Sequence, residues 1–147
     1  VYPLLQAVRE SLAAATRAQV PEEPITPTDP RLIRYLCAAL APQRSEVLMV
    51  LFLDRQHRLM HDEVVSVGSL TTLTFAPRVV LSRALELGAA AVILVHNHPG
   101  GDPHPSKIDI EATNVLFRIG AALEVSLLDH IIVAGSKWCS MERAGFL

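Results

Sequence analysis

A strand, a loop and a helix follow one another in AAAVILVHNHPGGDPHPSKIDIEATNVLFRIGAAL, residues 89–123. Residues 89–95 are an uninterrupted apolar run, which is typical of a strand buried on both faces of a sheet. From Ser106 to Leu123, apolar side chains recur at the spacing of one helix face. These side chains are Ile108, Ala112, Val115, Leu116, Ile119 and Leu123. We therefore expect a central strand over 89–95 and an amphipathic helix over 106–123.

Similar patterns predict the elements on either side of this unit. Asp29 followed by Pro30 is a typical helix start, and Gly88 has the position of a left-handed helix stop. The predicted helices cover 4–18, 30–40 and 77–87. The predicted strands cover 46–53, 58–67 (ended by Gly68), 125–128 and 131–133, with a last one near Trp138. This alternation predicts an α/β fold, a mixed β-sheet flanked by helices.

A cluster of prolines divides the chain into two parts. The prolines are Pro21, Pro24, Pro27 and Pro30. Because proline fixes its backbone and lacks an N–H, such a segment can be neither helix interior nor central strand. We interpret residues 1–27 as an N-terminal helix and proline-rich linker, the remnant of an upstream region, and residues 28–147 as the main domain. One stripe of the first predicted helix is apolar: Leu4, Leu5, Val8, Leu12 and Ala15.

Composition and charge narrow the classes of partner. The chain has 147 residues and a formal net charge of −2, so we expect one compact domain without a basic surface for nucleic acid. Cys37 and Cys139 are isolated in apolar surroundings, which indicates reduced core residues and favours a cytoplasmic setting. No apolar run reaches the roughly 18 residues that span a bilayer, so no membrane partner is expected. Exposed strand edges leave the oligomeric state open.

Three side chains around the Gly/Pro-rich loop have the chemistry of a metal site. His96 and His98 are two residues apart at the end of the central strand, so both imidazoles point to one side while Asn97 faces away. The glycines of the loop allow a sharp reversal, which brings Asp109, in the first turn of the helix, back toward the histidines. Two nitrogens and one carboxylate oxygen form a tripod that suits zinc and leaves one position open for water.

Other polar residues near this group have structural interpretations. His104 is expected to be a loop residue in preference to a fourth ligand. His130, beside Asp129 at a predicted strand start, is expected to be hydrogen-bonded in preference to ligating. The spacing of Ser106 and Asp109 is that of a helix capping box. A capped Asp109 can still bind a metal, so the two roles are compatible.

The order of these residues resembles the signature of the JAMM (MPN-plus) metalloproteases. The segments HNHP (96–99) and SKID (106–109), with seven residues between His98 and Ser106, match the pattern H-x-H, seven residues, S-x-x-D. The wider sequence resembles the RadC (UPF0758) family over roughly residues 28–147. The further matching segments are LFLD (51–54), GSL (68–70), APR (76–78) and DHIIV (129–133). The resemblance implies a JAB/MPN architecture, which is cytidine-deaminase-like.

The resemblance also implies an activity and roles for individual residues. It implies a zinc-dependent hydrolase that cleaves a peptide or isopeptide bond of a peptide or protein substrate with metal-activated water. Ser106 would donate a hydrogen bond to the oxyanion, beside the three metal ligands already named. A glutamate just before the first apolar strand would be the general base. Glu46 has that position, and Glu63, in the second predicted strand, is the alternative.

Other functions fit parts of the sequence. RadC-like proteins also suggest a DNA repair or recombination accessory module, which binds nucleic acid or protein and holds a non-catalytic metal; the acidic net charge argues against it. The letters of residues 96–98 match those of HNH nucleases, but those enzymes disperse the three residues over a ββα unit. Zinc deaminases are related in shape, but their H-x-E and P-C-x-x-C motifs are absent from this sequence.

Overall fold

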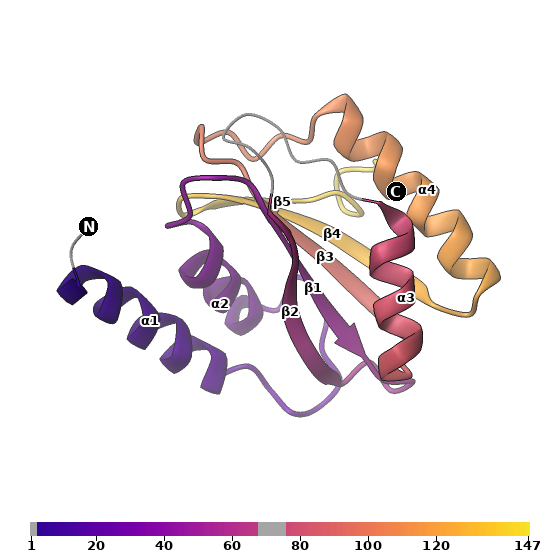
Figure 1. Cartoon of the computed structure of the whole chain (residues 1–147), viewed down its shortest axis with the longest axis horizontal. Coiled ribbons are helices and arrows are strands. Elements are labelled where there is room, and N and C mark those ends of the chain that lie inside the picture. The colour runs from indigo at the N-terminus through magenta and orange to yellow at the C-terminus, as the bar shows by residue number, and fades with distance from the viewer. Residues whose placement is uncertain (1–2, 68–75) are drawn as a thin grey trace.

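A mixed β-sheet runs through the molecule and helices cover both of its faces (Figure 1). The structure is a computed structural model and describes residues 3–67 and 76–147. Its elements are, in chain order, α1 (Pro3–Ala18), α2 (Pro30–Leu40), β1 (Val47–Leu53), β2 (Leu59–Val67), α3 (Pro77–Leu87), β3 (Ala91–Asn97), α4 (Lys107–Ala122), β4 (Ser126–Ala134) and β5 (Lys137–Ser140). The expected α/β class, a mixed sheet flanked by helices, is confirmed.

The strands of the described residues pair in the order β2-β1-β3-β4-β5. β3 and β4 are parallel, and the other pairs are antiparallel. Successive side chains of a strand face opposite sides. In β1 and β3, odd-numbered residues such as Met49 and Val95 pack toward α2, and even-numbered residues such as Leu48 and Leu94 pack toward α3 and α4. β3 is central, as expected. Polar groups at its C-terminal end therefore lie midway along the sheet edge that is formed by the ends of the strands.

Local signals set the ends of two helices. Asp29 caps α2 because its Oδ1 accepts the backbone N–H of Arg31 at 2.8 Å, and Pro30 takes the first helical position. Gly88 ends α3 in the left-handed region with φ 68°, which glycine adopts without a steric penalty. Both ends were predicted. The predicted end of the second strand at Gly68 lies outside the described residues.

The prediction of two short strands over 125–133 is wrong, because β4 is one continuous strand. Asp129 and His130 interrupt the apolar pattern, yet they pair with Ile93 and Leu94 of β3. The Asp129 carboxylate is 1% exposed and accepts hydrogen bonds from the His130 N–H, the Ser140 hydroxyl and the Glu142 N–H. These bonds satisfy the polar group inside the sheet, so the strand continues through it. Burial raises the pKa of Asp129.

The long helix α4 turns a different face to the sheet from the apolar stripe expected from sequence. Its buried residues are Asp109, Thr113, Leu116 and Gly120, whereas Ile108, Ile119 and Leu123 are exposed. A Cβ atom at position 120 would lie 2.5 Å from the carbonyl oxygen of Val125, so glycine permits this close approach of α4 to the chain entering β4. The buried face therefore carries polar residues toward the end of β3.

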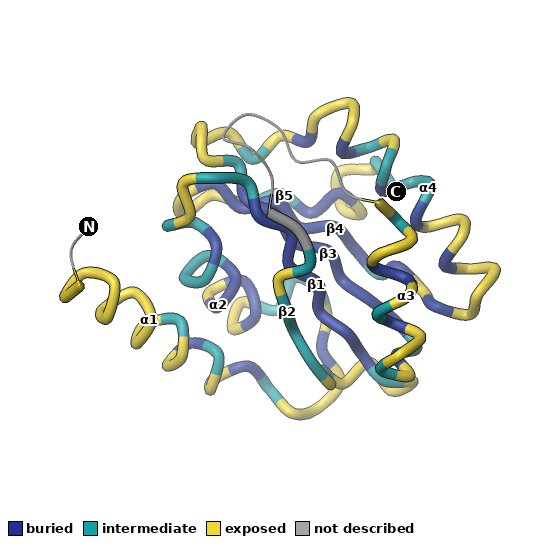
Figure 2. Tube along the Cα trace, viewed as in Figure 1, coloured by how far each residue is buried: buried dark blue, intermediate teal, exposed yellow. Residues whose placement is uncertain are grey.

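The N-terminal segment lies against the rest of the molecule, although the apolar stripe of α1 is exposed (Figure 2). Leu4 is 79% exposed, and α1 instead buries Thr16. The Arg17 Nε lies 3.2 Å from the Asp62 Oδ1 of β2, and the Tyr35 hydroxyl of α2 donates to the other oxygen of that carboxylate at 2.5 Å. Val20 and Ile25, from the proline-rich segment, are buried in the core under α2.

Cys37 and Cys139 are free thiols, as expected, but both are half-buried rather than fully inside the core. Burial raises the pKa of both thiols. Among the described residues, no helix combines the length and the apolar character that a bilayer crossing requires.

Candidate metal centre

His96, His98 and Asp109 meet at the end of the central strand. His96 ends the buried part of β3 on the face that α4 covers, and His98 follows two residues later on the same side. Asp109 comes from the first turn of α4. The Asp109 Oδ2 lies 3.4 Å from the His96 Nε2 and 3.2 Å from the His98 Nε2, and the two nitrogens are 2.8 Å apart. The three residues form a group that could hold a metal ion.

The spacing of these atoms fits a tetrahedral metal. Zinc bonds of about 2.0–2.1 Å in a tetrahedron place neighbouring ligand atoms about 3.3 Å apart. The two nitrogen-to-oxygen distances match that separation, and the nitrogen pair is about half an ångström closer than it. Three ligands fill three corners of a tetrahedron, so the fourth position of a bound ion would be left for a further ligand. Nitrogen and oxygen donors without a thiolate suit zinc and several other divalent ions.

The protonation of His98 is set by a backbone carbonyl group. The His98 Nδ1 lies 2.8 Å from the carbonyl oxygen of Asp102, which can only accept, so Nδ1 carries the proton and Nε2 can present a lone pair. The neighbouring carboxylate of Asp109, the hydrogen bond to the Asp102 carbonyl group and the nearby charge of Glu46 raise the pKa of His98. The loop that makes this contact turns at Gly101, whose φ is 92°.

Asp109 is held as a carboxylate. Burial opposes its ionisation, but the neighbouring His96 and His98 and the Ser106 N–H outweigh burial and hold its pKa well below the usual range. The Ser106 N–H also donates to its Oδ2, at 2.8 Å. In return, the Ser106 Oγ accepts the Asp109 N–H at 3.1 Å, so the predicted capping box is present. Ser106 itself is exposed, and both of these contacts join it to Asp109.

The two candidate glutamates have different surroundings. Glu46 is half-buried and immediately precedes β1, where Leu48 pairs with His96. Strand alternation puts Glu46 on the Leu48 side of the sheet, the side of the metal ligands. Glu63 pairs with Val50, further from this edge, and its carboxylate forms an ion pair with Arg83. Glu46 therefore belongs to the same sheet edge as the histidines, and Glu63 is engaged elsewhere.

Asn97 fixes the segment that carries Glu46, a role that the sequence did not indicate. As expected, it faces away from the ligands; its Oδ1 accepts the Val47 N–H at 2.8 Å, and its Nδ2 donates to the carbonyl oxygens of Ser45 at 3.0 Å and Gln43 at 3.4 Å. The side chain is 1% exposed. An amide between two ligands was the available signal, but its partners are about 50 residues away along the chain.

The other two histidines of this region lie outside the group of three candidate ligands found among the described residues. His104 is an exposed loop residue, as expected, and its ring packs edge to face on Phe146 at 5.8 Å. His130 is fully buried, and burial holds its pKa well below the ordinary value. Its two ring nitrogens lie 2.6 Å from the His96 Nδ1 and 2.7 Å from the Thr113 Oγ1. The expected hydrogen-bonded role of His130 is confirmed.

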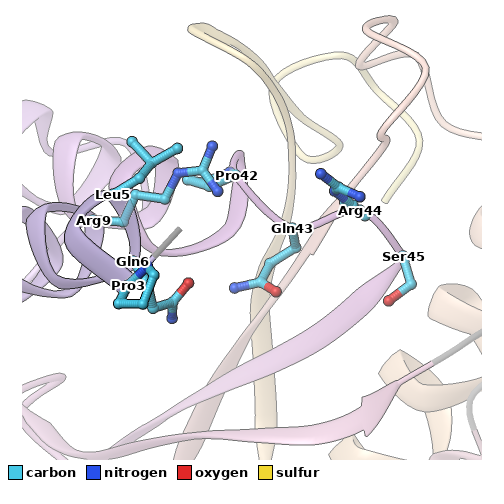
Figure 3. Close-up of a pocket in the computed structure, with 8 residues that line it drawn as sticks. All are labelled: Pro3, Leu5, Gln6, Arg9, Pro42, Gln43, Arg44 and Ser45. Atoms are coloured by element: carbon cyan, nitrogen blue, oxygen red, sulfur yellow. The ribbon is translucent and has the colours of Figure 1, made fainter. Parts of the chain in front are cut away.

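A cavity of about 680 Å³ lies beside residues 42–45, the segment that precedes Glu46 (Figure 3). Residues of α1 line one wall and residues 42–45 line the other. Arg9 and Arg44 both contribute to the lining, and neither forms an ion pair with a described residue.

The sequence of this chain is similar to those of known proteins. Residues 27–146 match the family model of the RadC-like JAB domain. A UPF0758 protein of Rhodobacter capsulatus is 37% identical over 143 residues, which are 97% of this chain and 67% of that protein. A UPF0758 protein of Methanosarcina mazei is 42% identical over 105 residues, 71% of this chain and 46% of that protein, so the match spans less than half of that relative. The chain belongs to the RadC-like JAB domain family.

Proposed function

We propose that this chain is a zinc-dependent hydrolase of the JAMM type that cleaves a peptide or isopeptide bond. The observation that carries the proposal is the tripod of His96, His98 and Asp109, whose ligand atoms leave one side of a bound ion open. A purely structural zinc site is closed by four protein ligands, whereas a catalytic site keeps a position for water or substrate. The setting proposed for this activity is the cytoplasm.

Bound zinc would act as a Lewis acid, which lowers the pKa of a bound water molecule to about 7 and polarises the scissile carbonyl group. Glu46 would accept a proton from the attacking water and pass it to the leaving amine. The Ser106 hydroxyl would donate a hydrogen bond to the oxyanion, a contact typically worth about 3 kcal/mol in the transition state. Asp109 would serve both the zinc and Ser106, because its carboxylate would bind the ion while its backbone N–H holds the Ser106 oxygen in place.

A pair of glutamate variants tests the proposal. Glu46→Gln removes the base without changing the size of the side chain, so we expect it to keep one zinc per chain and to lose turnover of peptide and lysine-linked isopeptide substrates. Glu63→Gln is the matched control and should retain turnover, because Glu63 pairs with Arg83. His96→Ala should lose both zinc and turnover. Normal hydrolysis by Glu46→Gln would refute the base assignment, and failure of the zinc-loaded chain to cleave any of these peptide or isopeptide substrates would refute the hydrolase proposal.

A further inference from the structure

A chain of buried hydrogen bonds links His96 to the helix that carries Asp109. The His96 Nδ1 lies 2.6 Å from the His130 Nε2, and the His130 Nδ1 lies 2.7 Å from the Thr113 Oγ1. The Thr113 Oγ1 in turn lies 2.5 Å from the backbone carbonyl oxygen of Asp109. None of the three side chains is more than 1% exposed. Bulk water therefore does not substitute for any partner in this chain.

The direction of every hydrogen bond in the chain follows from its last member. A carbonyl oxygen only accepts, so the single hydroxyl proton of Thr113 points to Asp109. The Thr113 oxygen must then accept the hydrogen bond that it forms with His130, so the His130 Nδ1 carries a proton and donates it to this bond. A neutral His130 with its proton on Nδ1 has a lone pair on Nε2, which accepts from the His96 Nδ1. His96 is thereby left with its lone pair on Nε2.

That lone pair points into the metal centre. The His96 Nε2 faces the His98 Nε2 and the Asp109 Oδ2, which are the other two ligand atoms. His98 reaches the same protonation pattern directly through the Asp102 carbonyl group. Two different routes therefore present two unprotonated Nε2 atoms to one point, which is the state that a divalent metal requires of imidazole ligands.

We infer that Thr113 and His130 are positioning residues, which fix the tautomer of His96 so that its Nε2 is available to bind the metal. Neither residue belongs to the H-x-H and S-x-x-D pattern, and neither is a ligand in this arrangement. The inference rests on the metal-binding part of the proposed function and does not depend on which bond is cleaved. It also gives Asp109 a second contribution, since the carbonyl group of this ligand orients the chain that serves another ligand.

Replacing Thr113 by valine should reverse the direction of the hydrogen bond between His130 and His96. Valine has nearly the shape of threonine but cannot accept a hydrogen bond, so the buried His130 Nδ1–H would lose the Thr113 oxygen as its acceptor. The tautomer of His130 with its proton on Nε2 then becomes favoured, and it can only donate to the His96 Nδ1. His96 would take its own proton on Nε2, in the position of the metal. Binding a metal would require restoring the costlier tautomers.

The experiment measures zinc affinity by competition with a chromophoric chelator. Loss of such an outer hydrogen-bond partner typically weakens metal binding by about 10- to 100-fold, and we expect a change of that size for Thr113→Val. Thr113→Ser, which keeps the hydroxyl group, should bind zinc as the wild type does. Thr16→Val is a matched control, because the Thr16 hydroxyl makes the same bond one turn back, to Leu12 at 2.8 Å, in α1. Its zinc affinity should not change.

Nitrogen NMR of the metal-free wild type, above the pKa of free histidine, supplies a second measurement that needs no variant. We expect His96 and His130 to carry their protons on Nδ1. Protonation of His96 on Nε2, or equal zinc affinity of Thr113→Val and wild type, would overturn the inference while leaving the hydrolase intact. A wild type that binds no zinc would overturn the proposed function as well.

Discussion

At the scale of single residues, the Ser106 hydroxyl group caps α4 and, in the proposed mechanism, would also donate to the oxyanion. Its oxygen accepts the Asp109 N–H and so caps α4, and no described group takes its proton. An accepted hydrogen bond uses a lone pair and leaves the O–H free to donate. The cap therefore fixes the position of the oxygen, and the proton remains available to an oxyanion beside the metal.

Two replacements of Ser106 separate these tasks. Ser106→Ala and Ser106→Gly both remove the hydroxyl group, but glycine at the cap position costs the helix only a few tenths of a kcal/mol, against about 1 kcal/mol for alanine. Both variants should lose about 100- to 1,000-fold in kcat at unchanged zinc content, because each lacks the oxyanion donor. Urea unfolding should rank glycine above alanine in stability. A glycine variant with nearly full kcat would mean that Ser106 serves only as a cap.

The sequence predicted these residues because their signals are local. Spacings of two and three residues place His96 beside His98 and Ser106 beside Asp109, whatever the rest of the fold does. The chain through Thr113 could not be predicted in this way. Thr113 sits among apolar positions of a helix, and its hydroxyl matters only because folding brings His130, 17 residues later, against it.

At the scale of elements, the loop before β1 is held by the end of β3. Asn97 makes three hydrogen bonds to the backbone of residues 43–47, and Glu46 lies within that segment. The bonds place the carboxylate of the proposed base relative to His98 without contacting it. A segment tied down at its backbone loses the freedom to swing the base away, which matters because proton transfer requires hydrogen-bond reach.

Removing this tie should slow turnover and spare the metal. Asn97→Ala leaves the buried Val47 N–H without its partner, a cost of about 1–3 kcal/mol in stability. We expect full zinc content and a fall in kcat of at least about tenfold, since a misplaced base is a poor proton acceptor. Asn114→Ala is the control: its amide also donates to two carbonyl oxygens, at 2.8 and 3.1 Å, but holds the C-terminal residues. Equal losses of kcat in the two variants would contradict a specific role for Asn97.

Helices and strands were predicted correctly where caps or apolar runs mark them. The prediction failed where contacts with residues distant in the sequence determine the structure. Asp29 and Gly88 mark helix ends by their own backbone chemistry. Asp129, by contrast, reads as a strand break, because a carboxylate inside a sheet is costly until Ser140 and Glu142 satisfy it. The prediction of which face of α4 is buried failed for the same reason. The candidate metal centre and the close contact at Gly120 bury a partly polar face in place of the apolar stripe.

At the scale of the whole molecule, the candidate metal centre joins two elements that the chain connects only through a loop. His96 and His98 belong to the end of β3, and Asp109 belongs to the start of α4. The unfolded chain keeps no such tripod, so a metal that binds all three residues stabilises the folded state selectively. This coupling allows the site to be tested through the stability of the molecule, without knowledge of a substrate.

Zinc at about 100 times its dissociation constant should add about 2.7 kcal/mol to the free energy of unfolding. For a chain of this length, that corresponds to a rise in Tm of about 5–10 °C between chelator-treated and zinc-loaded protein, measured by calorimetry. His96→Ala should show no zinc-dependent rise, whatever its own Tm, because the tripod is broken. His104→Ala should keep the full rise, because His104 packs on Phe146 away from the ligands. Since each variant is compared with itself, a general loss of stability cannot imitate the effect, and a zinc-dependent rise that survives in His96→Ala would place the metal at another site.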